Sequence, residues 1–160
     1  MSAVALYKEL RRLLQRNNPF PSMEDVDVVL ARYTEADIQE AVRMKDFIGC
    51  LLLHYACHQH VPVLIVQWLL DKEVENKSIY QQNRMGSLPI HGACLDYANL
   101  DSIRLLLERD VDKKTLLVRD IQGRLPLFTS TDEGNNVEVT KLVLREGICD
   151  RIERLRRTLP

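Results

Sequence analysis

The sequence has 160 residues, of which 46% are apolar and 28% charged, and this suits a globular domain with a sizeable core. Its formal net charge of −1 gives no overall attraction to nucleic acid or to an anionic membrane. Charged residues interrupt the first 16 positions, so we expect no signal peptide, and no apolar run is long enough to predict a transmembrane helix. The four cysteines show no disulfide framework, which favours reduced thiols and an intracellular location, cytoplasmic or nuclear.

Residues 1–45 are predicted to form an N-terminal helical cap. Leucines at helical spacing predict an amphipathic helix over residues 3–16. Two more helices are expected after Ser22 and Thr34, because each is followed three residues later by an aspartate in an N-cap pattern. None of these helices carries the motif that follows, and a repeat array needs an atypical unit to cover its first apolar face.

From residue 46 onward, one motif recurs at an interval of 37 residues. Its glycines are Gly49, Gly86 and Gly123. Each follows an Asp or Asn by three residues: Asp46, Asn83 and Asp120. This spacing is typical of a turn, because an Asp or Asn side chain can accept a hydrogen bond from the backbone two residues later and glycine permits a positive φ. A fixed period of this length indicates a repeat array, with expected units at residues 46–82, 83–119 and 120–150.

Each unit is predicted to hold two helices. The first helices are expected at Leu52–His60, Pro89–Tyr97 and Pro126–Glu133. The second helices are expected to begin at Val63, Leu100 and Val137, again 37 residues apart. Their apolar cores share one register, which also predicts a core position for Trp68. The third unit is expected to end around residues 147–150, followed by a separate basic helix or tail over 151–160 with Ile152 and Leu155 facing inward.

The motif Asp/Asn-x-x-Gly-x-Leu-Pro-Leu/Ile-His-x-Ala-Cys, followed by a second helix with a Leu-Leu pair, resembles the ankyrin repeat. The likeness covers about residues 46–149. It implies an all-α fold, an ankyrin-like solenoid of stacked antiparallel helix pairs with projecting turns or short hairpin fingers. The usual period is about 33 residues, so about four extra residues per unit predict an added helical turn. The usual Thr of Thr-Pro-Leu-His is Leu in all three units, and the third unit has Phe128 for His and Ser130 for Ala.

The His and Cys residues of the first helices suggest either a metal or catalytic site or a framework role. His54, Cys57 and His58 have feasible zinc-ligand spacing on one helix face. His54 and Cys57, however, recur as His91 and Cys94, and a position repeated in a solenoid is usually a framework position. No phosphate-binding glycine run, nucleophile elbow or paired-carboxylate motif is present. We therefore expect no enzymatic activity, no metal and no cofactor.

The basic clusters at Arg11-Arg12 and Arg151–Arg157 are interleaved with acids and lie at opposite ends of the array. They are therefore interpreted as solvated helix faces, and we expect neither nucleic acid nor membrane as a partner.

The family resemblance implies a non-enzymatic module that binds a protein or peptide through its finger tips and concave helix face. By motif position, the implied contact residues are Phe47, Ile48, His58, Gln59, Arg84, Met85, Leu95, Asp96, Ile121, Gln122, Arg124, Asp132 and Glu133. Their apolar members would form a strip on a turn-rich face, either as an interaction surface or packed on each other between fingers.

A different hypothesis is that the chain is a structural segment of a longer or self-associating repeat array. It is motivated by the third unit, which matches the motif less well, and by the small number of units. A monomeric binder is the expectation, and a mass in solution that rises with concentration would favour the array segment instead.

Overall fold

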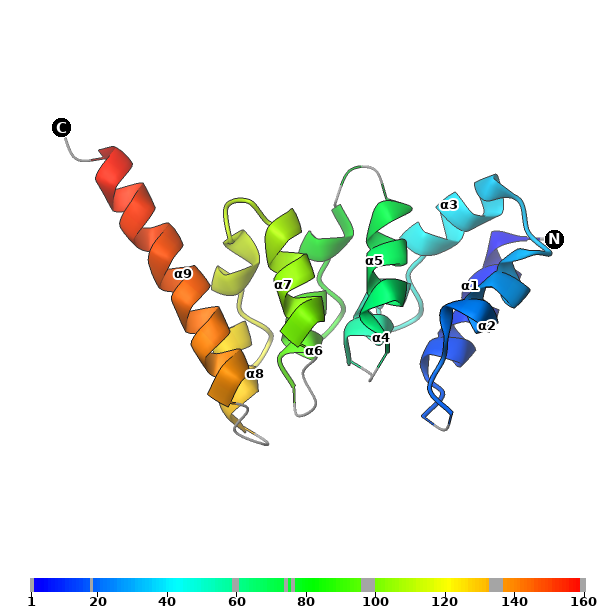
Figure 1. Cartoon of the computed structure of the whole chain (residues 1–160), viewed down its shortest axis with the longest axis horizontal. Helices are drawn as coiled ribbons and strands as arrows, with labels where there is room; N and C mark the ends of the chain where they lie inside the picture. Colours follow the sequence, from blue (N-terminus) through cyan, green and yellow to red (C-terminus); the bar gives the residue numbers. More distant parts are fainter. Residues whose placement is uncertain are drawn as a thin grey trace.

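The computed structural model describes residues 2–17, 19–58, 61–73, 75, 77–95, 100–132 and 137–158, without the side chains of residues 130–132 and 149–158. All regular secondary structure within these ranges is helical, which confirms the predicted all-α class. The helices follow one another along a single elongated row from the N-terminus to the C-terminus (Figure 1).

The N-terminal segment folds into three helices, α1 (Ala3–Leu14), α2 (Met23–Leu30) and α3 (Glu35–Arg43). The predicted N-caps are both present. The Ser22 hydroxyl accepts the Asp25 N–H at 3.2 Å, and the Asp25 carboxylate accepts the Ser22 N–H at 2.9 Å. Thr34 caps α3 in the same reciprocal way. Helix α1 packs against α2, α3 and α4, so its apolar face covers the start of the following row.

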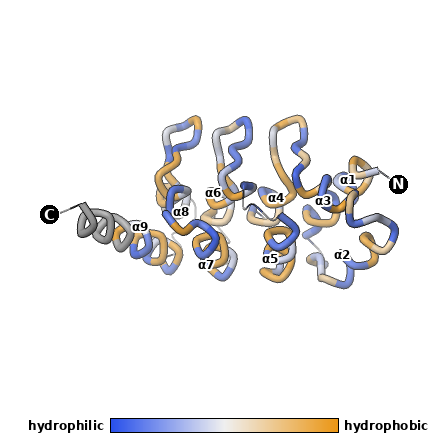
Figure 2. Tube along the Cα trace, turned by 90° about the horizontal axis from the view of Figure 1, so that it is seen from above, coloured by the Kyte–Doolittle hydropathy of each residue, from blue (hydrophilic) through white to orange (hydrophobic). Residues whose placement is uncertain are grey.

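The remaining described α-helices form three pairs. The first helices are α4 (Leu52–His58), α6 (Pro89–Ala93) and α8 (Pro126–Asp132). The second helices are α5 (Val63–Asp71), α7 (Leu100–Arg109) and α9 (Val137–Thr158). Helix α5 begins at its predicted residue, and the residues just before α7 and α9, 96–99 and 133–136, lie outside the described residues. Helix α4 packs on α6, α6 packs on α8, and α5 packs on α7. Figure 2 shows the turns along one edge, α5 and α7 along the opposite edge, and the first helices between them.

Two short 3-10 helices account for the extra residues of the long period. They are η1 (Lys77–Tyr80) and η2 (Lys114–Leu117), which lead from α5 and α7 to the next turn. Buried carboxylates cap both: Glu73 accepts the Ser78 N–H at 2.8 Å, and Asp110 accepts the Thr115 N–H at 2.8 Å. The added helical turn expected from the sequence is therefore a 3-10 turn held by an acidic side chain.

One continuous apolar core runs from α1 to α9. Leu6, Val26 and Leu70 are completely buried in it. Trp68 is only half-buried and packs against this core, so its predicted core position holds in part. Burial of apolar surface between neighbouring helices is the main stabilisation available to such a row, since a single pair cannot cover its own apolar faces.

The third unit differs from the prediction at its end. The sequence suggested a break around residues 147–150 and a separate basic helix, but α9 continues without interruption from Val137 to Thr158. Gly147 lies inside this helix, and its φ is not positive. In Figure 1, α9 leans outward and runs past the ends of α5 and α7. A helix-interior glycine costs only about 1 kcal/mol, and the flanking residues are good helix formers, so the helix propagates through it.

Candidate functional site

The three turns share one hydrogen-bonded construction. The Asp46 carboxylate accepts the N–H groups of Ile48 at 3.0 Å and Cys50 at 2.8 Å. Asn83 does the same for Met85 and Ser87, and Asp120 for Gln122 and Arg124. The glycine of each turn has a positive φ, between 69° and 78°. The predicted Asx-x-x-Gly chemistry is therefore present in every unit.

Neighbouring turns are joined through their backbones. The Arg84 N–H donates to the Ile48 carbonyl at 2.9 Å, and the Ile121 N–H donates to the Met85 carbonyl at 3.0 Å. A Cβ on Gly86 would lie 2.9 Å from the Ile121 nitrogen, a separation that real Cβ atoms do not adopt. Glycine is thus needed in the second turn for its φ and also for the close approach of the third turn. These links hold the turns side by side as one edge.

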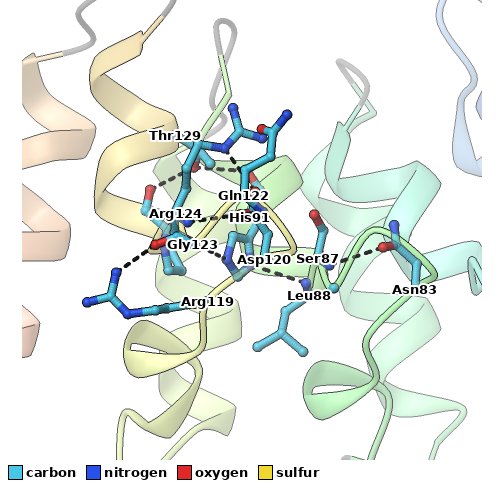
Figure 3. A network of polar contacts seen from close by, with 12 residues as sticks. Asn83, Ser87, Leu88, His91, Arg119, Asp120, Gln122, Gly123, Arg124 and Thr129 are labelled. Atoms are coloured by element: carbon cyan, nitrogen blue, oxygen red, sulfur yellow. Dashed lines mark hydrogen bonds and ion pairs between the residues drawn. The ribbon is translucent and has the colours of Figure 1, made fainter.

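Two buried histidines, one on α4 and one on α6, join these first helices to the turn of the next unit. His54 Nδ1 accepts the Leu51 N–H at 3.1 Å, which leaves the proton on Nε2, and Nε2 donates to the Ser87 carbonyl at 3.1 Å. His91 repeats the arrangement with the Leu88 N–H at 3.1 Å and the Arg124 carbonyl at 3.4 Å (Figure 3). Burial lowers the pKa of His54 to about 4 and also lowers the pKa of His91. Both side chains are therefore neutral connectors at ordinary pH.

A buried polar cluster fixes the first turn against the N-terminal segment. Arg11 pairs with Asp46 at 3.4 Å, Tyr55 donates to the same carboxylate, and Tyr7 donates to the Cys50 carbonyl at 2.8 Å. Burial alone would raise the pKa of Asp46, but the hydrogen bonds from Tyr55 and the backbone outweigh it and the pKa is lowered. Asp46 is thus an ionised structural group that orients the turn.

The turns and first helices form a groove of about 440 Å³, to which α5 and α7 contribute no lining residue. Residues from the C-cap of α1, from the three turns and from the first helices or their ends line it. They are Gln15, Ile48, Cys50, His54, Tyr55, His58, Asn83, Met85, Ser87, Leu88, His91, Gly92, Leu95, Arg124 and Thr129. Ile48 and Met85 give the groove apolar surface, and Arg124, which also lines it, pairs with Asp120 at 2.9 Å. The groove is open to the outside.

The structure brings five of the predicted contact residues into this groove, namely Ile48, His58, Met85, Leu95 and Arg124. Four others, Phe47, Arg84, Ile121 and Gln122, lie exposed on the turns and do not line it. Gln59, Asp96 and Glu133 lie outside the described residues, and so does the side chain of Asp132.

The expected apolar strip divides between two sides of the turn edge. Phe47, Met85 and Ile121 are 72%, 51% and 63% exposed, so they do not pack away against one another. The third residues of the first two turns, Ile48 and Met85, line the groove, whereas the second residues do not. The exposure of these side chains favours the hypothesis of an accessible surface over that of apolar residues packed against one another between fingers.

The sequence analysis missed two kinds of groove residue. Gln15 is the C-cap of α1, which lies outside the repeated motif, and no periodic signal pointed to it. Tyr55, Gly92 and Thr129 occupy the same position in the three units, just after the motif that starts each first helix. A comparison of this position between the units could have identified these residues, because neither the family motif nor the apolar core pattern explains why the amino acid differs from unit to unit.

Burial and backbone hydrogen bonds favour the neutral forms of Cys50, His54 and His91 in the groove. Burial raises the pKa of the Cys50 thiol, and both ring nitrogens of His54 and His91 are engaged with backbone groups. Burial also raises the pKa of Cys94 to about 12 and that of Cys57 further. Within the part of the chain that the structure describes, no group of three or more His, Cys, Asp or Glu side chains is placed to hold a metal ion.

No family model matches the chain, and no curated protein matches it. None of the described helices is both long and apolar enough to cross a membrane.

Proposed function

We propose that the chain is a non-enzymatic protein-interaction module that binds a protein or peptide segment in the groove between its turns and first helices. The observation that carries the proposal is the groove itself, with exposed apolar side chains from two successive turns at its mouth. Exposed apolar surface beside adaptable polar groups is typical of interaction sites, and Met and Tyr are enriched at interface centres.

The fold supports an ankyrin-like assignment. The 37-residue units each comprise an Asx-x-x-Gly turn and a helix pair, and the turns are bonded edge to edge. The histidine that precedes the small residues of the first helix bonds the next turn in two units. The departures from the family, a longer connector with a 3-10 turn and leucine in place of the motif threonine, change the connections and leave the pairing of the helices intact.

The hydrogen-bonded framework of the turns also supports a binding role. Asp46, Asn83 and Asp120 fix the turn backbones, and the links between turns fix the turns to each other. A partner that enters such a groove meets a surface that is already ordered, so little conformational entropy of this chain opposes binding. His54, His91 and Cys50 serve as framework groups under this proposal, and neither metal nor cofactor is required.

Selection of displayed random peptides on the immobilised chain tests the proposal. The bait is the wild-type chain, and the enriched peptides are then tested for binding to Ile48→Glu/Met85→Glu and to the control Val28→Glu/Val111→Glu. The control residues are exposed apolar side chains outside the groove. We expect a family of related peptides that binds wild type and the control but not the groove variant. Peptides that bind all three proteins equally, or no enrichment at all, would count against the groove.

A second candidate is a structural role as a segment of a longer or self-associating array. It is favoured by the third turn, because a Cβ built on Gly123 would meet nothing within 4 Å, whereas those on Gly49 and Gly86 would meet the next turn. Sedimentation velocity over a range of concentrations distinguishes the two: a constant monomer mass supports the binding module, and a mass that grows with concentration supports the array segment.

A further inference from the structure

The outward face of α9 exposes a leucine whose counterparts in the two preceding units are buried. Leu70 on α5 and Leu107 on α7 occupy equivalent positions and are 0% and 2% exposed, whereas Leu144 on α9 is 40% exposed. Helix α5 packs on α7, and α9 follows α7 across a small crevice lined by Leu107 and Leu142. Leu144 therefore lies on the side of the row where each earlier unit is covered by the next, which identifies an uncovered helix-packing face.

The exposed apolar residues of α9 form a narrow stripe. Val137, Leu144 and Ile148 are all exposed, and their spacing of seven and four residues puts them on one side of the helix. The buried residues Val139 and Val143 lie on the opposite side. Ile152 and Leu155, which the sequence predicted to face inward, have side chains outside those that the structure describes. A stripe of this width matches the contact line between two packed helices.

Cations accompany this stripe. Lys141 and Arg145 are exposed at helical spacing from Leu144 and Ile148, and Arg151 continues that spacing in the sequence. In the described part of the exposed face, Glu138 is the acidic residue, and it already pairs with Lys141 at 2.9 Å. Two cations against one paired acid leave a positive charge beside the apolar contact line, which favours an acidic partner.

We propose that the outward face of α9 docks an acidic amphipathic helix of a partner protein, separately from the groove. The helical form of the partner follows from the earlier junctions, in which a second helix is covered by another helix. A second copy of this chain would bring Lys141 and Arg145 of two chains together. A membrane surface fits less well, because the stripe is narrow and contains no aromatic residue of the kind enriched in interfacial helices.

Binding of a synthetic helix tests this proposal by fluorescence anisotropy. The probe is a fluorescein-labelled peptide of about three heptads with Leu at the a and d positions and Glu elsewhere, and the comparison peptide has Lys in place of Glu. Wild type should bind the acidic peptide, and Leu144→Glu/Ile148→Glu should weaken this binding at least about tenfold. Lys141→Glu/Arg145→Glu should reverse the preference in favour of the basic peptide.

Val111→Glu is the matched control, because Val111 is the exposed counterpart of Ile148 in the preceding unit, and it should bind the acidic peptide as wild type does. Equal binding by wild type and Leu144→Glu/Ile148→Glu would overturn the proposal. So would wild-type binding to phosphatidylserine vesicles in place of the peptide, or a dimer that the same substitutions dissociate. Binding of groove-selected peptides by each variant shows that it is folded and separates this test from that of the groove.

Discussion

Single residues determine how closely the turns approach one another. Asp46, Asn83 and Asp120 each hold two backbone N–H groups, and the turn glycines supply the positive φ that this geometry requires. Gly86 and Gly123 have nearly the same φ but different surroundings. A Cβ on Gly86 would press on the backbone of the third turn, whereas a Cβ on Gly123 would enter open space.

This contrast predicts unequal effects of two otherwise identical substitutions. Gly123→Ala should cost only the left-handed backbone strain, roughly 1–2 kcal/mol of unfolding free energy. Gly86→Ala should cost clearly more, because the third turn must also move away and the bond from Ile121 to Met85 is lost. Urea denaturation of both variants measures the difference. Equal losses would mean that the close contact between the turns does not contribute to stability.

His54 links stability to pH. Its pKa is about 4 in the folded protein against about 6.5 for an exposed histidine, so the unfolded chain takes up the proton first as the pH falls. The stabilisation is fully present above pH 6.5 and is lost as the pH falls toward 4, with about 2 kcal/mol lost between pH 7 and pH 5. His54→Gln should flatten that slope in urea titrations at the two pH values. An unchanged slope in His54→Gln would show that His54 is not buried in its neutral form.

At the level of elements, the sequence predicted helix starts better than helix ends. The starts at Val63, Leu100 and Val137 follow a strict period, and Ser22 and Thr34 carry cap signals that local hydrogen bonds enforce. The end of α9 had no such signal. Gly147 suggested a stop, yet a glycine ends a helix only where the backbone takes a positive φ, and that depends on what the following residues contact.

A substitution at Gly147 distinguishes a continuous helix from an interrupted one. In the structure Gly147 is inside α9, and an added Cβ would make an ordinary 3.7 Å contact with Leu116. Gly147→Ala should therefore stabilise the chain by about 1 kcal/mol, through helix propensity. Thermal unfolding followed by circular dichroism measures this change. A destabilised variant would indicate the left-handed glycine and the helix break that the sequence first suggested.

The candidate site was predictable in outline and not in detail. The motif identified the turns and first helices, and Ile48, Met85 and Leu95 do line the groove. The motif could not show whether the second or the third residue of a turn lines the groove, because the direction of each side chain depends on the backbone dihedral angles of the turn. Gln15 was out of reach for another reason: its place in the groove depends on the packing of α1 against α4.

For the molecule as a whole, the groove is a shared property of adjacent units. Its lining comes from α1, from three turns and from three first helices, so no single unit can form it. The bonds between turns and the two histidine bridges hold these parts in one arrangement. None of the residues that line the groove comes from α9, which makes the two proposed surfaces separable by substitution.

The most direct measurement is a calorimetric titration of a groove-selected peptide into three proteins: wild type, Ile48→Glu/Met85→Glu and Leu144→Glu/Ile148→Glu. All four substituted side chains are exposed, so the variants should keep the helicity and melting midpoint of wild type. The groove variant should bind at least about tenfold more weakly, a loss of about 1.4 kcal/mol. The α9 variant should bind as wild type does. Equal affinity of all three proteins, or loss only in the α9 variant, would contradict the groove as the binding site.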